Sequence, residues 1–167
     1  IAPEDNSIPF LGIPNCKVVL ASSSTTRQNI LRSAGVDFKV FSAIIDEESV
    51  RASAINDDML PSDIAVLLAT LKAMAVFKKL MLSKSLNDRS YIIGCDQILL
   101  FNNQIISKPT SIASAKKQLL ILSGHEHKLL SAIVLIHDGQ KIWHHLAEAS
   151  LTMQRFDADF AEAYVQH

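Results

Sequence analysis

The sequence is poor in the residues that mark several common classes of protein. It contains only two cysteines, Cys16 and Cys95, without the paired spacing of a metal site, so free thiols are favoured over a disulfide. No segment is long and apolar enough to span a bilayer. The first residues lack the basic and apolar regions of a signal peptide. We therefore expect a cytoplasmic protein.

The chain also lacks an excess of charge of either sign. Its 16 lysines and arginines against 17 acidic residues give a formal net charge of -1. Charge alone therefore predicts no binding to nucleic acids or to membrane surfaces. An anionic ligand would have to be recognised locally, by a few well-placed cations.

No repeat, low-complexity tract or internal linker divides the 167 residues. A content of 49% apolar and 20% charged residues is typical of a globular protein. We expect residues 1–14 to form an N-terminal lead-in and residues 15–167 a single domain. Helical and strand patterns alternate early, and hairpin signals follow at Asn102-Asn103 and Asp138-Gly139. This order predicts an α/β fold with helices packed on a mixed sheet.

Three familiar catalytic motifs are absent from the sequence, namely the Walker A loop, the nucleophile elbow and the HExxH zinc motif. His125 and His127 have the spacing of two same-side positions on a strand. No third ligand accompanies them, so zinc is not expected.

The stretch from Lys17 to Leu31 reads as a strand, a turn rich in hydroxyl groups and a helix. The helix N-terminus and the hydroxyl groups would form an anion site, to which Arg27 can add a bidentate contact. The alternative is an ordinary helix cap formed by Ser24 or Thr25.

Asp96 is the most informative single residue, because it interrupts the apolar run from Tyr91 to Leu100. A carboxylate in such a run is costly unless it is paired or binds a metal ion. Gly94 would let a backbone or a ligand come close. We favour a functional role for Asp96 over the alternative that it ends a strand and caps a turn.

Other charged groups are weak signals when each is taken alone. Asp46-Glu47-Glu48 offers oxygen ligands for Mg²⁺ or Mn²⁺, although a run of three acidic residues is, taken alone, usually a solvated loop. Lys72, on a helix expected to start at Pro61, and Lys108 could bind phosphate or lie on the surface.

Six short motifs, taken in order, match the pattern of one protein family. They are Ala21-Ser22-Ser23-Ser24-Thr25-Thr26-Arg27, Asp46-Glu47, Leu68-Ala69-Thr70-Leu71-Lys72-Ala73, Ile93-Gly94-Cys95-Asp96, Lys108-Pro109 and Leu122-Ser123-Gly124-His125-Glu126-His127. Each is weak alone, but their shared order over about Lys17 to Ser131 is specific. In this respect the chain resembles the Maf family of nucleoside triphosphate pyrophosphatases.

The resemblance implies the Maf/inosine-triphosphatase-like fold, a mixed β-sheet flanked by helices with a nucleotide-binding cleft. It implies hydrolysis of a nucleoside triphosphate to the monophosphate and pyrophosphate with Mg²⁺ or Mn²⁺. Asp96 would be the general base, and Glu47 and Asp96 would hold the metal ion. The phosphate-binding residues that it implies are Ser22, Ser24, Arg27, Lys72 and Lys108.

Two departures from the family pattern concern the base. Thr26 stands where many members carry the first of two arginines, and Gln97 stands where dTTP- and UTP-hydrolysing members carry threonine. Both features are similar to the branch that acts on 7-methyl-GTP, so we predict Thr26 and Gln97 as specificity residues and a modified nucleotide as substrate, in house-cleaning of the nucleotide pool.

Two alternatives stay open at this point. One is a dTTP or UTP pyrophosphatase, and the other is a non-catalytic, nucleotide-binding regulator of septum formation and cell division. The resemblance also implies a homodimer. The family pattern continues into a glycine-rich segment and a closing helix, which this sequence does not contain.

Overall fold

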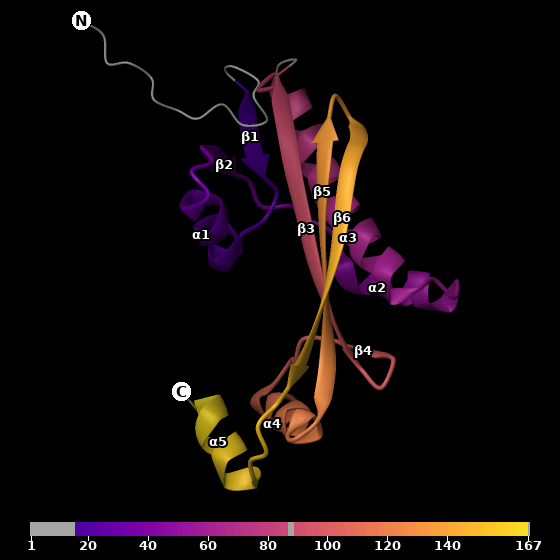
Figure 1. Ribbon diagram of the computed structural model, residues 1–167. Coiled ribbons are helices and arrows are strands. Elements are labelled where there is room, and N and C mark those ends of the chain that lie inside the picture. The colour runs from indigo at the N-terminus through magenta and orange to yellow at the C-terminus, as the bar shows by residue number, and fades with distance from the viewer. Residues whose placement is uncertain (1–15, 87–88, 167) are drawn as a thin grey trace, which may run out of the picture. The chain divides into compact units, whose positions relative to one another are not determined.

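The computed structural model describes residues 16–86 and 89–166 (Figure 1). The expected lead-in over residues 1–14 lies outside the described residues, as do two residues of the turn expected at 87–90. In chain order, the elements are β1 (Lys17–Leu20), α1 (Thr25–Ser33), β2 (Phe38–Val40), α2 (Glu47–Asn56), α3 (Pro61–Leu82), β3 (Ser90–Phe101), β4 (Gln104–Ile106), α4 (Ile112–Leu122), β5 (Glu126–His137), β6 (Gln140–Thr152) and α5 (Ala158–Gln166).

The strands form one mixed sheet, as the sequence predicts. Its order is β2-β1-β3-β5-β6, and β4 pairs with β3. β1 is parallel to β2 and to β3, with Val18 opposite both Phe38 and Tyr91. β4 is antiparallel to β3. The fold is therefore α/β, and helices form the connections between the parallel strands.

The described chain divides into two compact units. The first contains the residues up to Asp96 together with Ala132–His145, and the second contains Gln97–Ser131 and the residues from Leu146 onward. The expectation of a single domain stays a prediction.

In the first unit, the strands β1 and β3 are buried on both faces of the sheet. One face carries an apolar cluster that includes Leu20, Ile93 and Cys95, and Leu31 of α1 packs against it. The other face lies against α3, whose Ile64 and Leu68 are fully buried (Figure 1). Strands covered on both sides need continuous apolar runs, and the runs over β1 and β3 are of this kind.

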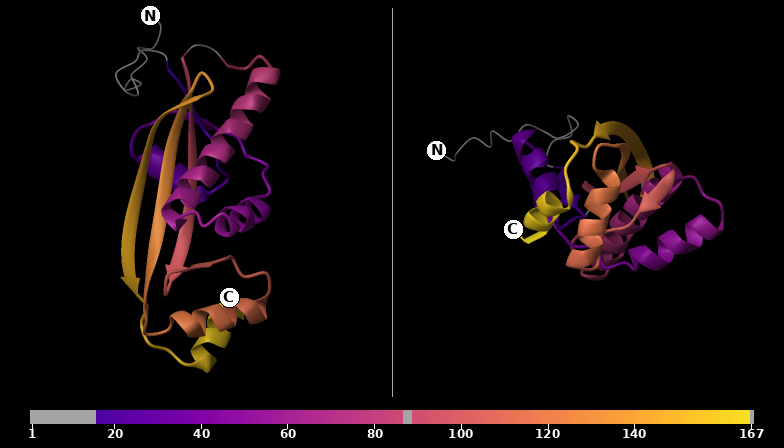
Figure 2. Two further views of the ribbon diagram at one scale, coloured as in Figure 1. Left: turned by 90° about the vertical axis from the view of Figure 1, so that its right-hand side faces the viewer. Right: turned by 90° about the horizontal axis from the view of Figure 1, so that it is seen from below.

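The second unit contains the hairpin of β3 and β4 and the helices α4 and α5, which pack on each other (Figure 2). Lys116 of α4 forms an ion pair with Glu162 of α5 at 2.7 Å. The β3–β4 hairpin has positive φ at both Asn102 and Asn103, 50° and 61°, which is the two-residue turn that the sequence predicts.

Local signals account for most element ends. Ser24 caps α1 by accepting a hydrogen bond from the N–H of Arg27, and Gly35 follows that helix with φ 71°. Pro61 occupies the first turn of α3, and Ser111 forms a capping box at α4. None of the described helices has the length and hydropathy needed to cross a membrane.

Two predicted segments differ from the structure. The acidic run Asp46-Glu47-Glu48 is not a loop, because Asp46 caps α2 and the two glutamates form its first turn, where negative charge is favourable. The alternating pattern from Phe38 to Ile44 predicts a strand over those residues, but β2 ends at Val40, where its pairing with β1 ends at Leu20.

Candidate active site

The hydroxyl-rich turn between β1 and α1 folds back on itself. The buried Ser22 hydroxyl oxygen accepts hydrogen bonds from the N–H of Ser24, at 3.2 Å, and from Nη1 of Arg27, at 3.3 Å. Ser24 caps the helix, as the alternative interpretation predicts. The N–H groups of Thr25 and Thr26 head α1 without partners inside the helix. The turn therefore caps the helix and also presents N–H groups that can bind an anion.

Arg27 ties this turn to β3. Its Nη1 also donates to the backbone oxygen of Cys95, at 3.3 Å. Cys95 itself is buried, and burial raises the pKa of its thiol. The guanidinium group is thereby held one residue away from Asp96.

Three predicted site residues meet in a network of charges. Nζ of Lys72 lies 2.6 Å from Oδ1 of Asp96 and 3.0 Å from Oε1 of Glu47. The exposed fractions of the three side chains are 12% for Lys72, 5% for Asp96 and 36% for Glu47. A buried carboxylate needs a partner, and Lys72 is one such partner for Asp96. The three residues come from α3, β3 and the first turn of α2.

A close contact between α3 and β3 brings Lys72 to Asp96. A Cβ atom on Gly94 would clash with the backbone oxygen of Ala69 and would lie 2.8 Å from Cβ of Ala73. Gly94 and Asp96 share one face of β3, since side chains alternate along a strand. The helix therefore packs directly on the glycine, and Lys72, one residue before Ala73, reaches the carboxylate.

The second carboxylate oxygen of Asp96, Oδ2, is buried and has no hydrogen-bond partner among the described residues. Such an atom is costly to bury, which points to a partner outside the protein chain. The described part of the chain contains no group of three or more His, Cys, Asp or Glu residues arranged to hold a metal ion. Mg²⁺, however, commonly uses one or two carboxylates together with substrate phosphates. Glu47 and Asp96 fit that kind of site.

The predicted specificity residues lie apart from this network. Gln97 lies on the opposite face of β3 from Asp96, and its Nε2 donates to the hydroxyl oxygen of Ser131 of β5 at 2.8 Å. Thr26 is exposed in the first turn of α1. Lys108 is exposed and belongs to the second unit, and its part in phosphate binding stays a prediction.

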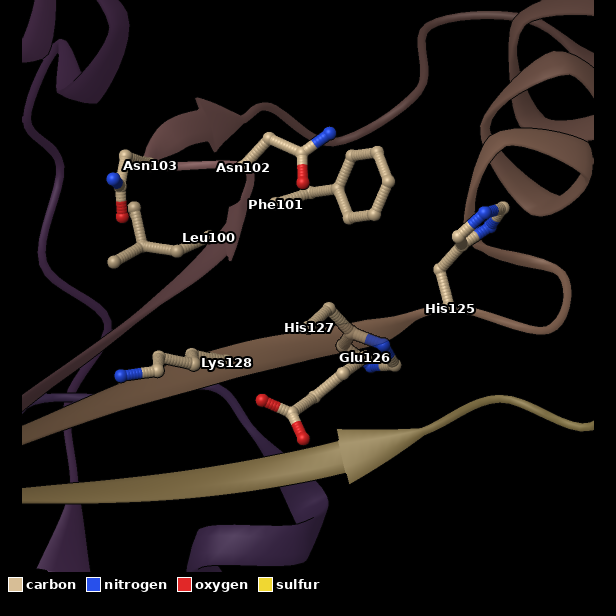
Figure 3. A pocket seen from close by; sticks show the side chains of 8 residues that line it. All are labelled: Leu100, Phe101, Asn102, Asn103, His125, Glu126, His127 and Lys128. Atoms are coloured by element: carbon tan, nitrogen blue, oxygen red, sulfur yellow. The ribbon is translucent and has the colours of Figure 1, made fainter.

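A separate pocket of about 360 Å³ lies within the second unit, between the β3–β4 turn and the start of β5 (Figure 3). Its wall includes Phe101, Asn102, His125, His127 and Lys128. His127 is buried, and its Nδ1 has no partner in the described structure. None of the predicted site residues lines this pocket, so it is distinct from the network of charges.

Sequence reasoning missed three contributors to the site. Ser131 is 34 residues from Gln97, and nothing local marks it as a partner. The backbone oxygen of Cys95 and the small side chains of α3 carry no chemical signal of their own. The close approach itself was indicated by Gly94, and the spacing of Ala69 and Ala73, one helical turn apart on either side of Lys72, is a second pattern that agrees with it.

Sequence comparison assigns the family. The sequence model described as Maf-like protein matches residues 17–167. A protein of Brucella abortus named 7-methyl-GTP pyrophosphatase is 40% identical over 149 residues, which are 89% of this chain and 71% of the relative. A protein of Paramagnetospirillum magneticum named nucleoside triphosphate pyrophosphatase is 37% identical over 147 residues, which are 88% and 72% of the two chains.

Among solved structures, a HAM1 protein from Coxiella burnetii aligns with 81% of this chain and 70% of its own, at a TM-score of 0.47 and 13% identity. That similarity is too weak to support an argument, so the assignment rests on the sequence matches. The family match over residues 17–167 and the 40% identity to the Brucella abortus relative show that the chain belongs to the Maf-like protein family.

Proposed function

We propose that this protein is a nucleoside triphosphate pyrophosphatase that hydrolyses a modified nucleotide such as 7-methyl-GTP to the monophosphate and pyrophosphate. The observation that carries the proposal is the Glu47–Lys72–Asp96 network, with one carboxylate oxygen of Asp96 left without a partner. The names of the relatives from Brucella abortus and Paramagnetospirillum magneticum support the reaction. The name of the Brucella relative also supports 7-methylguanine as the nucleotide base.

Asp96 is the proposed general base. Water adds across the bond between the α- and β-phosphates, which breaks to release pyrophosphate, and the carboxylate accepts the proton that the water loses. Oδ2 is the atom available for this step, since Oδ1 is bonded to Lys72. A general base in position typically contributes about 10²–10⁴-fold to the rate.

The remaining predicted residues bind the triphosphate. Arg27 can offer a planar pair of donors, and the first turn of α1 presents unpaired N–H groups near Ser22 and Ser24. Lys72 and Lys108 add positive charge, which the triphosphate requires because the chain has no basic excess.

A divalent cation, Mg²⁺ or Mn²⁺, belongs to the proposal. Glu47 and Asp96 would hold it, because Oε1 of Glu47 and Oδ1 of Asp96 already converge on one cation, the Lys72 ammonium group, which leaves Oδ2 of Asp96 for the proton. When bound, such an ion offsets the negative charge of phosphate oxygens. Formation of a homodimer stays a prediction from the family resemblance.

Pyrophosphate release from 7-methyl-GTP, UTP, dTTP, GTP and ITP, with Mg²⁺ or Mn²⁺, tests the proposal. We expect the fastest release from 7-methyl-GTP. A preference for UTP or dTTP would keep the reaction but contradict the assigned base. If none of the five nucleotides releases pyrophosphate although the protein binds nucleotide, the proposed enzymatic activity is wrong. A regulator that binds nucleotides is then favoured.

The Asp96→Asn variant tests the role of Asp96 as the general base. We expect a loss of about 10²–10⁴-fold in turnover with nucleotide binding retained, because the amide cannot accept the proton. Asp63→Asn is the matched control, since Asp63 is exposed in the first turn of α3 and contributes nothing to the network. Equal turnover in wild type and Asp96→Asn would remove Asp96 from the mechanism.

A further inference from the structure

One ammonium group serves two carboxylates in the candidate active site. Lys72 contacts both Asp96 and Glu47, and the three formal charges add up to -1. A triphosphate is strongly anionic, so this local charge opposes its binding unless a further cation arrives with it. At the same time, the lysine already lies where the two carboxylates converge. A divalent cation and the Lys72 ammonium therefore compete for the same two ligands.

We propose that Lys72 is a place-holding cation, which leaves Glu47 and Asp96 when a divalent cation binds them and then contacts the phosphates of the substrate. The proposal deepens the proposed function and rests on it, because the cation and the triphosphate are the ones implied there. It assigns Lys72 two successive partners instead of one fixed ion pair.

The geometry allows this exchange. Asp96 is fixed in the sheet, with only 5% of its side chain exposed, and it retains one unpartnered oxygen. Glu47 is 36% exposed in the first turn of α2, where its side chain is free to adjust. The lysine ammonium group is carried by a flexible four-carbon stem. Two of the three groups can thus move while the third stays in place.

The exchange predicts coupling between the two ligands. The cation binds more readily once Lys72 has left the carboxylates, and Lys72 leaves more readily when phosphate oxygens accept it. By linkage, each ligand then raises the affinity of the other. A purely structural ion pair predicts the opposite result on loss of the lysine, because the carboxylates would repel each other and lose their arrangement.

The first experiment measures Mn²⁺ binding to the nucleotide-free protein, by electron paramagnetic resonance of the free ion. In Lys72→Gln we expect Mn²⁺ to bind about tenfold or more tightly than in wild type, since the competing charge is gone. The double variant Lys72→Gln/Asp96→Asn should lose this gain. Unchanged or weaker binding by the folded Lys72→Gln variant would overturn the proposal.

Lys116→Gln is the matched control, because it removes a lysine from an ion pair of similar length, with Glu162, in the second unit. Its Mn²⁺ affinity should equal that of wild type. A gain equal to that of Lys72→Gln would show that loss of any lysine raises Mn²⁺ binding, and would overturn the proposal.

A second measurement needs no variant. The ¹³C resonance of the Lys72 Cε group, followed by NMR in wild type, should shift as Mg²⁺ is added without nucleotide, while that of Lys116 stays constant. A Lys72 signal that does not move at saturating Mg²⁺ contradicts the exchange, even if Lys72→Gln fails to fold.

The two proposals fail separately. If wild type hydrolyses 7-methyl-GTP while the NMR signal of Lys72 does not shift and Lys72 does not compete with Mn²⁺, the proposed reaction stands and the exchange is wrong. If Mn²⁺ displaces Lys72 but no nucleoside triphosphate is hydrolysed, the exchange stands and the proposed reaction is wrong.

Discussion

At the scale of single residues, the site depends on polar groups whose partners come from other elements. Asp96 is buried in a strand and is paired by a lysine from a helix. Gln97, its neighbour, is exposed and bonded to a serine of the adjacent strand. Because side chains alternate along β3, the proposed general base Asp96 and the predicted specificity residue Gln97 lie on opposite faces of the strand. A substitution of one should therefore leave the other side chain in place.

The Gln97–Ser131 hydrogen bond gives a prediction about the nucleotide base. Because Nε2 donates to Ser131, the amide oxygen of Gln97 is left to accept from a donor on the base. In Ser131→Ala we expect the ratio of kcat/KM for 7-methyl-GTP over UTP to fall by about 2–10-fold, the value of one hydrogen bond. Steady-state kinetics with both nucleotides measure this ratio.

Ser131→Thr is the control for this change, since it keeps the hydroxyl group and should keep the ratio. An unchanged ratio in Ser131→Ala, with wild-type stability, would show that Ser131 does not orient the amide of Gln97.

At the scale of elements, the contact of α3 with β3 sets the geometry of the charged network. Ala69 and Ala73 pack on Gly94, and Lys72 lies between them in sequence. Interiors pack as densely as crystals, so even one added methyl group must displace its neighbours. The helix–strand contact and the Lys72–Asp96 ion pair are therefore expected to change together.

The Gly94→Ala variant tests this contact. We expect the free energy of unfolding to fall by about 1–3 kcal/mol from overpacking, with a parallel loss of turnover as Lys72 moves away from Asp96. Urea unfolding and pyrophosphate release measure the two effects. Adding Ala73→Gly should restore part of the stability, because it removes one of the two clashes and leaves that with the Ala69 oxygen. Wild-type stability of Gly94→Ala would contradict the close packing.

The packing of α5 on α4 gives a prediction about pH. The hydrogen bond from Lys116 lowers the pKa of Glu162 below its ordinary value of 4.5. A carboxyl group with a lowered pKa in the folded state stabilises that state above the ordinary value, and the contribution disappears as pH falls through the lowered pKa. We therefore expect Lys116→Gln to weaken the packing of α5 at neutral pH but not in acid.

Hydrogen–deuterium exchange of the α5 amides, corrected for the intrinsic rate at each pH, measures this difference. The variant should exchange faster than wild type at pH 7 and equally at strongly acidic pH. Because the pair is exposed, the expected difference is small. Equal exchange at pH 7 would mean that the pair contributes nothing to the packing of the two helices.

At the scale of the whole molecule, the proposed site residues divide between the two compact units. Ser22, Arg27, Glu47, Lys72 and Asp96 belong to the first, and Lys108 belongs to the second. Binding of a cation by Glu47 and Asp96 needs only residues of the first unit, whereas the part of Lys108 in phosphate binding is a separate prediction.

This division predicts a separable effect of Lys108→Ala. The variant should bind the nucleotide more weakly, with KM raised about tenfold for the loss of one phosphate contact, yet bind Mn²⁺ as wild type does in the absence of nucleotide. Steady-state kinetics measure KM for the nucleotide, and calorimetry measures the affinity for Mn²⁺. Lys117→Ala, an exposed lysine of α4 outside the proposed site, is the control. An unchanged KM in Lys108→Ala would remove Lys108 from phosphate binding.

Much of the fold could be predicted from local sequence. The cap at Ser24, Pro61 at the start of α3 and the turns at Asn102-Asn103 and Asp138-Gly139 all act through backbone conformation within a few residues, and all were confirmed. The start of α2 at the acidic run Asp46-Glu47-Glu48 was not predicted, because charge is a weaker indicator of secondary structure than apolar periodicity.

Local sequence is enough to predict the α/β class, most of the helices and strands, and an aspartate inside an apolar strand that needs a partner. The identity of that partner follows from the folded structure alone. The choice of Lys72, with Glu47 beside it, depends on how closely α3 approaches β3. The pairing of Gln97 with Ser131 depends on the register between β3 and β5. Both are contacts between residues far apart in the chain, and local propensity carries no information about such contacts.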